Sequence, residues 1–191
     1  NGTYTSSASA TILTLLQMIN PDIPHNEGMI EPLEIIIPEG TILNASYPKA
    51  TTFGNHLCPP NADAIMRALA PAIPDNVTAG WNNLFCSLTS ARDEEKDDTY
   101  VDIFFMGQKG GSGGMKGTDG YDHIGMIDAS GGMVDQDYEM FEQQTPHLLK
   151  KHEYTTDSGG AGQWRGGLGV ETIYTIGSED PQFVTFGDGD F

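Results

Sequence analysis

The sequence has few basic residues. Only 9 of its 191 residues are Lys or Arg, against 27 Asp and Glu, so the net charge is −18 and the pI is near 4.3. Nucleic-acid binding needs clustered Lys and Arg to neutralise phosphates, so this charge argues against nucleic acid and against anionic membrane surfaces. We interpret the acidity as a solvated surface that keeps the protein dispersed, with a basic partner surface as the alternative.

Cysteine and long apolar runs are also scarce. The two cysteines, Cys58 and Cys86, match no CxxC or Cys/His ligand spacing and cannot make a disulfide framework. Free thiols in a reducing cytosol are therefore expected. No apolar run approaches the roughly 20 residues of a membrane span, and no signal peptide is visible. We expect a cytoplasmic protein with no membrane partner.

Glycine, by contrast, is abundant, with 24 residues. Glycine loses much backbone entropy on folding, so this number predicts special conformations or close main-chain contacts. The chain begins at Asn1 in a helix-like segment and stops at Phe191 after a strand-like run. We expect an internal to C-terminal fragment of a larger subunit, with a helix and strand part over 1–90 and a glycine-rich strand part over 91–191.

Two segments of the first half are predicted to be helical. The first runs from Ser6 to Ile19 and ends before Asn20-Pro21; the second runs from Asn61, as N-cap, to Ala70. Apolar residues at helical spacing predict their buried faces. These are Ala8, Ile12, Leu15, Leu16 and Ile19 in the first helix, and Ala64, Ile65, Ala68 and Leu69 in the second.

Short strand-like runs separated by turns occur mainly in the second half. They span 33–37, 84–88, 100–106, 148–155, 170–176 and 183–186. A turn is expected at 38–40, resumed extended chain at 41–45 and a charged exposed loop at 91–99. Two helices in the first half and a strand-rich second half with glycine-rich loops predict a mixed α+β fold.

The most distinctive segment is 157–169, where six glycines surround Asp157, Trp164 and Arg165. Glycine pairs allow main-chain N–H groups to form concave anion sites, to which Arg165 can add a bidentate donor. Arg165 and Asp157 are therefore the best catalytic candidates, and Gly159 and Gly160 are candidates for binding substrate or an anion. Composition alone favours another interpretation, in which an Asp157–Arg165 pair fixes a tight loop and Trp164 anchors it by packing.

A second glycine-rich segment spans 107–122. It follows a strand, as a phosphate-binding loop would, but it has no Lys-Ser/Thr pair and no following helix. An exposed or interface loop is the better interpretation.

The segment 135–142 contains four carboxylates. If it is helical, Glu139 and Glu142 share a face, where they could serve acid–base chemistry or bind a hard cation. Glu139 is a candidate for substrate binding, although a solvated face or a charge partner for Arg165 is the more ordinary role. No histidine lies in a zinc motif. His123, near Asp119 and Asp122, is the best single ligand candidate, but a hydrogen-bonded structural role is favoured, and we assign no metal ligand.

The 157–169 segment resembles the C-terminal signature of the hydantoinase B / oxoprolinase family, which includes N-methylhydantoinase B-like proteins and relatives of acetone and acetophenone carboxylases. Three further segments resemble the family in the same order, so the resemblance covers about 20–176. They are 38–41 (Pro-Glu-Gly-Thr), 110–113 with Asp119-Gly120, and 138–142 followed by Pro146.

The resemblance implies a B-type subunit of a large cytoplasmic, hetero-oligomeric assembly. A companion, hydantoinase A-like subunit would use ATP with Mg²⁺ to phosphorylate the substrate, and the B-type subunit would complete the reaction, often with a divalent transition metal. The family's metal motifs, similar to GTHxxD and HxxDxGG, are absent here, so the chain is expected to hold no cofactor and to be inactive alone.

The resemblance leaves three roles open. The first is part of an ATP-dependent cyclic amide hydrolase of the hydantoinase, 5-oxoprolinase or lactamase type. The second is part of a ketone carboxylase, because residues 135–139 depart from the Thr-Pro-x-Glu-like sequence of many hydantoinases. The third is a non-catalytic scaffold that packs against the rest of its own subunit and the companion.

Overall fold

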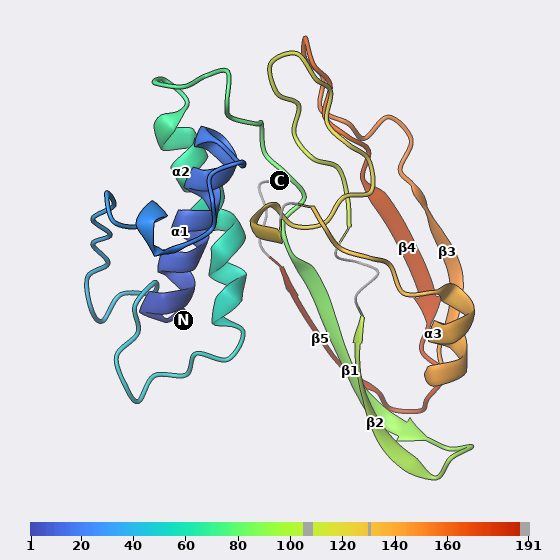
Figure 1. Ribbon diagram of the computed structural model, residues 1–191. Coiled ribbons are helices and arrows are strands. Elements are labelled where there is room, and N and C mark those ends of the chain that lie inside the picture. The colour runs from blue at the N-terminus through green and yellow to red at the C-terminus, as the bar shows by residue number, and fades with distance from the viewer. Residues whose placement is uncertain (105–108, 130, 188–191) are drawn as a thin grey trace.

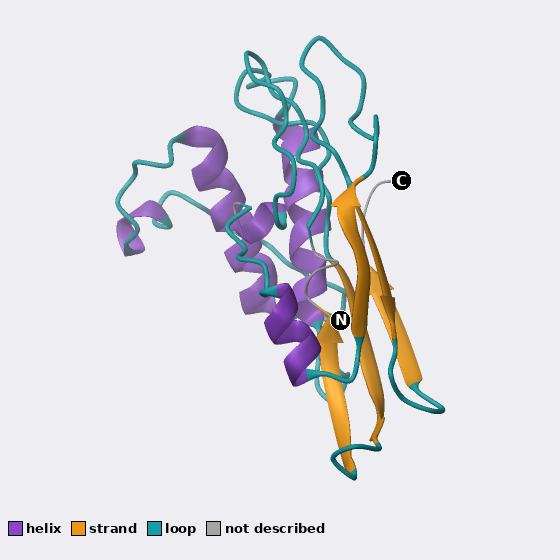
Figure 2. Cartoon of the chain, turned by 90° about the vertical axis from the view of Figure 1, so that its right-hand side faces the viewer, coloured by secondary structure: helices purple, strands orange, loops and turns teal. Residues whose placement is uncertain are grey.

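The computed structural model describes residues 1–104, 109–129 and 131–187 and has the predicted α+β fold. α1 and α2 lie on one side of the molecule, and the strands lie on the other (Figures 1 and 2). No helix in the described part of the chain has the length and apolar character needed to cross a membrane. The elements in chain order are α1 (Tyr4–Ile19), η1 (Glu27–Met29), η2 (Gly54–Leu57), α2 (Cys58–Leu69), β1 (Phe85–Asp93), β2 (Asp98–Phe104), η4 (Ile127–Ala129), α3 (Tyr138–Gln144), β3 (Leu148–Tyr154), β4 (Val170–Thr175) and β5 (Gln182–Gly187).

The first predicted helix is confirmed as α1, with a capping box at its N-terminus. The Thr3 side chain accepts a hydrogen bond from the Ser6 N–H, and the Ser6 side chain accepts one from the Thr3 N–H. The predicted buried face is partly wrong, because Ile19 is 59% exposed whereas Met18 is only 2% exposed. The buried side runs through Thr14, whose hydroxyl donates to the Ala10 carbonyl at 2.7 Å. This internal bond allows a polar residue to be buried, which an apolar pattern does not predict.

The second predicted helix is confirmed as α2, but it begins at Cys58 rather than at Asn61. Pro59 and Pro60 lie in its first turn, where the N–H that proline lacks has no partner within the helix anyway. Asn61 is therefore not the N-cap, and its side chain instead donates to the Ser7 carbonyl of α1 at 3.2 Å. The predicted burial of Ala64 and Ala68 is wrong, since both are exposed.

The two helices share one apolar core. Ala62 and Met66 of α2 pack with Met18 of α1 and with Ile127 of η4, which is fully buried. Side chains from the segment after α2, including Val77 and Trp81, pack against this core. The helical part is thus held together by side-chain packing.

The predicted strand at 33–37 is wrong. These residues have no regular secondary structure and pair with no strand in the described structure, and the Ile35 carbonyl accepts a hydrogen bond from the Tyr4 hydroxyl of α1. The turn at 38–40 is confirmed, with Gly40 at a φ of 80°. Residues 41–45 form a tight turn rather than extended chain, closed by a bridge between Thr41 and Asn44.

Two antiparallel sheets form the other side. The first has the order β2-β1-β5, and the second pairs β3 with β4. Four of the predicted strands therefore appear as β2 to β5, although residues 105–106 of the first lie outside the described residues. β1 begins at Phe85, one residue into the predicted 84–88 strand, and continues to Asp93. The predicted 91–99 loop therefore shrinks to a short turn in which Asp93 accepts hydrogen bonds from the Glu95 and Lys96 N–H groups.

A second apolar core joins the sheets to α3. Phe104 of β2 stacks on Tyr174 of β4 with ring centroids 4.4 Å apart, and Phe141 of α3 is fully buried beside them. The buried His147 ring lies in the same cluster, with Asp102 as its nearest carboxylate at 3.8 Å and no hydrogen bond to either ring nitrogen. Burial lowers the pKa of His147, an effect that Asp102 partly opposes, and burial raises the pKa of Asp102.

Candidate functional site

Residues 110–122 and 157–169, here called the glycine-loop cluster, lie together although they are far apart in sequence. A Cβ atom on Gly111 would lie 2.1 Å from the Gly167 carbonyl oxygen, and one on Gly167 would lie 2.1 Å from the Tyr121 carbonyl oxygen. Gly113 meets the Ala79 carbonyl in the same way, at 2.0 Å. These glycines allow main-chain segments to touch where any side chain would collide.

Hydrogen bonds reinforce these contacts. The Gly167 N–H donates to the Ser112 carbonyl at 2.9 Å, and the Gly120 N–H donates to the Arg165 carbonyl at 2.7 Å. Two carboxylates close the arrangement, because Asp119 accepts from the Arg165 N–H at 2.8 Å and Asp122 accepts from the Leu168 N–H at 2.6 Å. The described part of the second glycine-rich segment thus makes its contacts within this chain, including those against residues 157–169. Its residues 107–108 lie outside the described residues.

The predicted Asp157–Arg165 ion pair is present. The Arg165 guanidinium donates to the Asp157 carboxylate at 3.0 Å, with side chains that are 48% and 91% exposed. Gly159 lies beneath the pair, where an added Cβ would meet both the Gly166 carbonyl and Arg165 Nε, whereas Gly160 has open space around it. A guanidinium has five N–H donors, so the half-exposed Arg165 can still donate to an incoming anion.

α3 confirms that the acidic segment is helical, but its carboxylates have separate roles. Asp137 caps the helix by accepting from the Met140 N–H at 2.9 Å, and Glu142 accepts from the Leu149 N–H at 2.9 Å. Glu139 is exposed in the first turn. α3 lies toward the end of β3 and β4 that is distant from the glycine-loop cluster (Figure 1), so the structure does not place Glu139 with Arg165.

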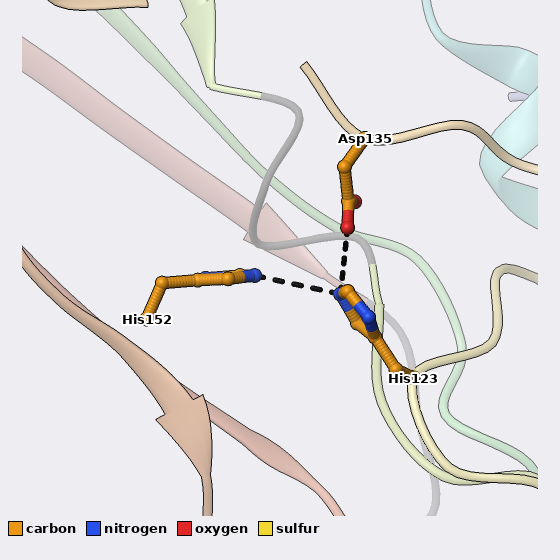
Figure 3. Close-up of side chains that lie close together, drawn as sticks. All are labelled: His123, Asp135 and His152. Carbon is orange, nitrogen blue, oxygen red and sulfur yellow. Dashed lines mark hydrogen bonds and ion pairs between the residues drawn. The ribbon is translucent and has the colours of Figure 1, made fainter. Parts of the chain in front are cut away.

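A different group of side chains converges beside the β3–β4 pair. His123 comes from the loop after the 110–122 segment, Asp135 from the loop before α3, and His152 from β3 (Figure 3). Nε2 of His123 lies 2.8 Å from Oδ2 of Asp135 and 3.4 Å from Nε2 of His152. In the described part of the chain, this is the group of His, Cys, Asp or Glu side chains whose ligand atoms lie close enough to hold a metal, all within 4.8 Å.

Neighbouring residues hold these three side chains in place. Nδ1 of His152 lies 2.9 Å from the Thr172 hydroxyl on β4, and Lys109 forms an ion pair with the other oxygen of Asp135 at 3.3 Å. The side chains of Tyr138 and Tyr154 line a pocket of about 170 Å³ beside the two imidazoles. All three clustered side chains are partly buried, and two of them, His123 and His152, line this pocket.

The surroundings disfavour a charged His152. Burial lowers the pKa of His152, His123 and Lys109 lower it further, and Asp135 opposes them. The pKa of the Tyr138 hydroxyl is raised by burial and by the nearby Asp135 and Tyr154. His152 is therefore neutral near pH 7 and has one ring nitrogen with an available lone pair.

The sequence pointed to His123 but to the wrong neighbours. Asp119 and Asp122, which are close in sequence, bind main-chain N–H groups instead. The groups that meet His123 are Asp135 and His152, which follow at intervals of twelve and seventeen residues and match no short motif. Only the pairing of β3 with β4 and the path of the preceding loops bring them together.

The chain is similar to known proteins over nearly its whole length. Residues 1–190 match the family model described as Hydantoinase B/oxoprolinase. The beta subunit of the caprolactamase of Pseudomonas jessenii is 31% identical over 96% of this chain and 32% of its own length. A putative D-/L-hydantoinase B subunit of Pseudomonas sp. (strain NS671) is 32% identical over 78% of this chain and 24% of its own length. The chain thus spans a third or less of these relatives.

Solved structures share the fold. A nucleotide-free acetone carboxylase matches all of this chain and 25% of its own chain, with a TM-score of 0.83 and 23% identity, a level at which the likeness shows the fold alone. The ATP-dependent caprolactamase of Pseudomonas jessenii matches 89% of this chain and 30% of its own, with a TM-score of 0.77 and 29% identity.

Proposed function

Because the chain belongs to the hydantoinase B/oxoprolinase family, we propose that it is part of the B-type subunit of an ATP-dependent cyclic amide hydrolase. The observation that carries this proposal is the similarity to two relatives named as the beta or B subunits of a caprolactamase and a hydantoinase. A companion, hydantoinase A-like subunit then uses ATP with Mg²⁺ and activates the cyclic amide by phosphorylating its oxygen. The parent assembly is a cytoplasmic hetero-oligomer.

The chemistry explains why ATP is needed. An amide carbonyl is a poor electrophile, and a phosphorylated amide oxygen makes its carbon easier for hydroxide to attack. The family's divalent metal would supply that hydroxide from the half of the subunit that carries the family's metal motifs. The described residues of this chain provide a positioning surface, in which the glycine-loop cluster holds Arg165 and Asp157 at its exposed edge.

Arg165 is the residue of this chain that we place nearest to substrate. Its half-exposed guanidinium is suited to an anionic group such as the phosphoryl group of the activated amide. Gly159 and Gly160 add main-chain groups on the same edge, and Asp157 orients the guanidinium. Glu139 lies elsewhere on the surface, so its part in substrate binding requires another segment of the subunit to approach α3.

The test uses the full parent subunit purified with its companion. We expect ATP hydrolysis that depends on adding a lactam, a hydantoin or 5-oxoproline, with ring-opened product forming in step with ADP. A rate of ATP hydrolysis that does not change when any of these cyclic amides is added would contradict the proposal. Arg165→Ala should then lower turnover strongly while Arg165→Lys retains part of it, and a scaffold role is supported instead if both variants match the wild type.

A ketone carboxylase is the second candidate, and the sequence Asp135-Gln136-Asp137-Tyr138-Glu139 is the observation that favours it. In that case ATP would activate bicarbonate and the enol form of the ketone. Incorporation of labelled bicarbonate into acetone or acetophenone by the same assembly separates the two candidates. Incorporation without cyclic amide hydrolysis would replace the first proposal with the second.

A further inference from the structure

We propose that His123, Asp135 and His152 form a binding site for a divalent transition metal of the zinc type within this chain. The prediction from sequence placed no metal ligand here, since no short motif links the three residues. The geometry of the cluster is independent of which reaction the parent assembly catalyses.

The distances allow a metal ion to replace the contact between His123 and Asp135. The three ligand atoms lie within 4.8 Å of one another, and the 2.8 Å between His123 and Asp135, which is a hydrogen-bond distance, must lengthen when a metal binds between the two groups. Nε2 of His123 faces Asp135 at 2.8 Å and His152 at 3.4 Å, and one ring N–H cannot satisfy both acceptors in a straight line. Two nitrogens bound at about 2.0–2.1 Å to a tetrahedral metal lie roughly 3.3 Å apart, close to the spacing of the two imidazoles.

The orientation of His152 supports the same assignment. Nδ1 of His152 lies 2.9 Å from the Thr172 hydroxyl, and in the tautomer whose Nδ1–H donates to that hydroxyl, Nε2 carries the lone pair on the side of the ring that faces His123 (Figure 3). A hydrogen bond from the second ring nitrogen is the usual way in which proteins orient a metal-binding histidine. Thr172 on β4 thus positions a ligand on β3, and strand pairing fixes the two residues opposite each other.

The ligand set selects the class of metal. Two imidazoles and one carboxylate suit zinc and its first-row neighbours, whereas Mg²⁺ and Ca²⁺ prefer oxygen ligands. Three protein ligands leave a fourth position for water or substrate, and here that position can face the pocket lined by Tyr138, Glu153 and Tyr154.

Lys109 sets the expected strength of binding. Its ammonium group lies 3.3 Å from Oδ1 of Asp135 and leaves Oδ2 facing His123, so it fixes the carboxylate as a one-oxygen ligand. Its positive charge also opposes an incoming cation. We therefore expect weaker binding than at a His₂Asp site without a lysine, and tighter binding after Lys109→Met.

The test measures metal content rather than turnover, so its failure is distinct from failure of the proposed function. The full subunit with its companion is stripped with chelator, titrated with Zn²⁺ in excess Mg²⁺, and assayed for bound zinc per subunit and for the zinc-dependent rise in Tm. His152→Ala and His123→Ala should each lose one equivalent of zinc relative to the wild type. His25→Ala, which alters an exposed histidine outside the cluster, should lose none.

Two milder variants keep the proposal testable if the alanine variants fail to fold. Thr172→Val retains the shape of the side chain but removes the acceptor for Nδ1, and it should weaken zinc binding roughly 10- to 100-fold. Lys109→Met should strengthen it. Equal zinc content and equal affinity in the wild type, Thr172→Val and Lys109→Met would overturn the proposal and leave the cluster as a hydrogen-bonded structural group.

Discussion

Around α1 and α2 the apolar core is made of side chains, whereas in the glycine-loop cluster the close contacts join main-chain atoms. Met18, Ala62, Met66 and Ile127 fill the space between the helical elements. In the loop cluster, carbonyl groups occupy the positions where side chains would begin. A core made of side chains can relax around a small change, but backbone packed on backbone has no soft part that can move. The two regions should therefore respond differently to substitutions of similar size.

The largest effect is expected from adding one methyl group to the glycine-loop cluster. Gly113→Ala places a Cβ about 2.0 Å from the Ala79 carbonyl oxygen, which requires two main-chain segments to separate. We expect a loss of about 4 kcal/mol in the free energy of unfolding, at the upper end of overpacking effects. Denaturant unfolding of the subunit, monitored by hydrogen exchange in the loops, measures it.

Gly80→Ala is the matched control for that variant. Gly80 follows Ala79 directly but has no atom within 4 Å of the added Cβ. Its unfolding free energy should change by less than about 0.5 kcal/mol. Equal losses in the two variants would show that close contact with the Ala79 carbonyl is not the cause of the effect, because Gly→Ala without such a contact is expected to be neutral or stabilising.

Removing a side chain from the helical core should have the next largest effect. Met18→Ala leaves a cavity between α1, α2 and η4, and we expect a loss of about 3 kcal/mol, because the neighbouring side chains can partly close the gap. Ile19→Ala alters the next residue, which is 59% exposed, and should cost less than about 0.5 kcal/mol. Thermal unfolding of the two variants compares them directly, and a reversed order would contradict the observed helix face.

A smaller, pH-dependent effect is expected in the second apolar core. Because burial lowers the pKa of His147 below that of the unfolded chain, the unfolded state takes up its proton first as the pH falls. The contribution of neutral His147 is complete above pH 6.5 and is lost as the pH falls from 6.5 toward the folded-state pKa. Asp102, whose pKa is raised, acts in the opposite direction at lower pH.

His147→Phe provides the measurement. The ring lies among Tyr100, Phe141 and Tyr174, and neither of its nitrogens has a hydrogen-bond partner, so an apolar ring fits the site. The unfolding free energy of the variant should fall less steeply than that of the wild type between pH 7 and 5. Parallel curves would mean that other groups, such as His56 and His152, carry the acid sensitivity.

The smallest effect on stability is expected at Arg165. Its ion pair with Asp157 is exposed, so Arg165→Ala should cost only about 0.2–1 kcal/mol, even though it lies in the region where Gly113→Ala costs most. Chemical denaturation of Arg165→Ala beside Arg165→Lys checks this value. A loss above about 2 kcal/mol would show that the pair fixes the loop, and a loss of turnover in that variant could then not be assigned to substrate contact.

The same contrast explains what the sequence could predict. Periodic apolar residues indicated α1, α2 and the strands β2 to β5, because these elements follow local patterns. The faces of the helices were partly wrong because Thr14 is buried through its own hydrogen bond and Asn61 binds α1 instead of capping α2. Residues 33–37 have the composition of a strand but no neighbouring strand to pair with in the described structure.

The site was less accessible to prediction because it depends on long-range geometry. The Asp157–Arg165 pair could be anticipated, since its members are eight positions apart in a segment that contains several glycines. The approach of Asp135 and His152 to His123 could not, because it requires the glycine loops, the loop before α3 and the β3–β4 register together. Asp119 and Asp122 were misleading because proximity in sequence does not show which group a carboxylate binds.

The position of β5 has a consequence for how the chain acquires its structure during synthesis. Leu88 of β1 pairs with Val184 of β5, about one hundred positions later, while β1 and β2 form a local hairpin. The β1–β2 hairpin can therefore form outside the ribosome long before β5 has been synthesised. Until β5 emerges, one edge of β1 stays open to other strands, so nascent chains shortened before residue 182 should be prone to aggregation.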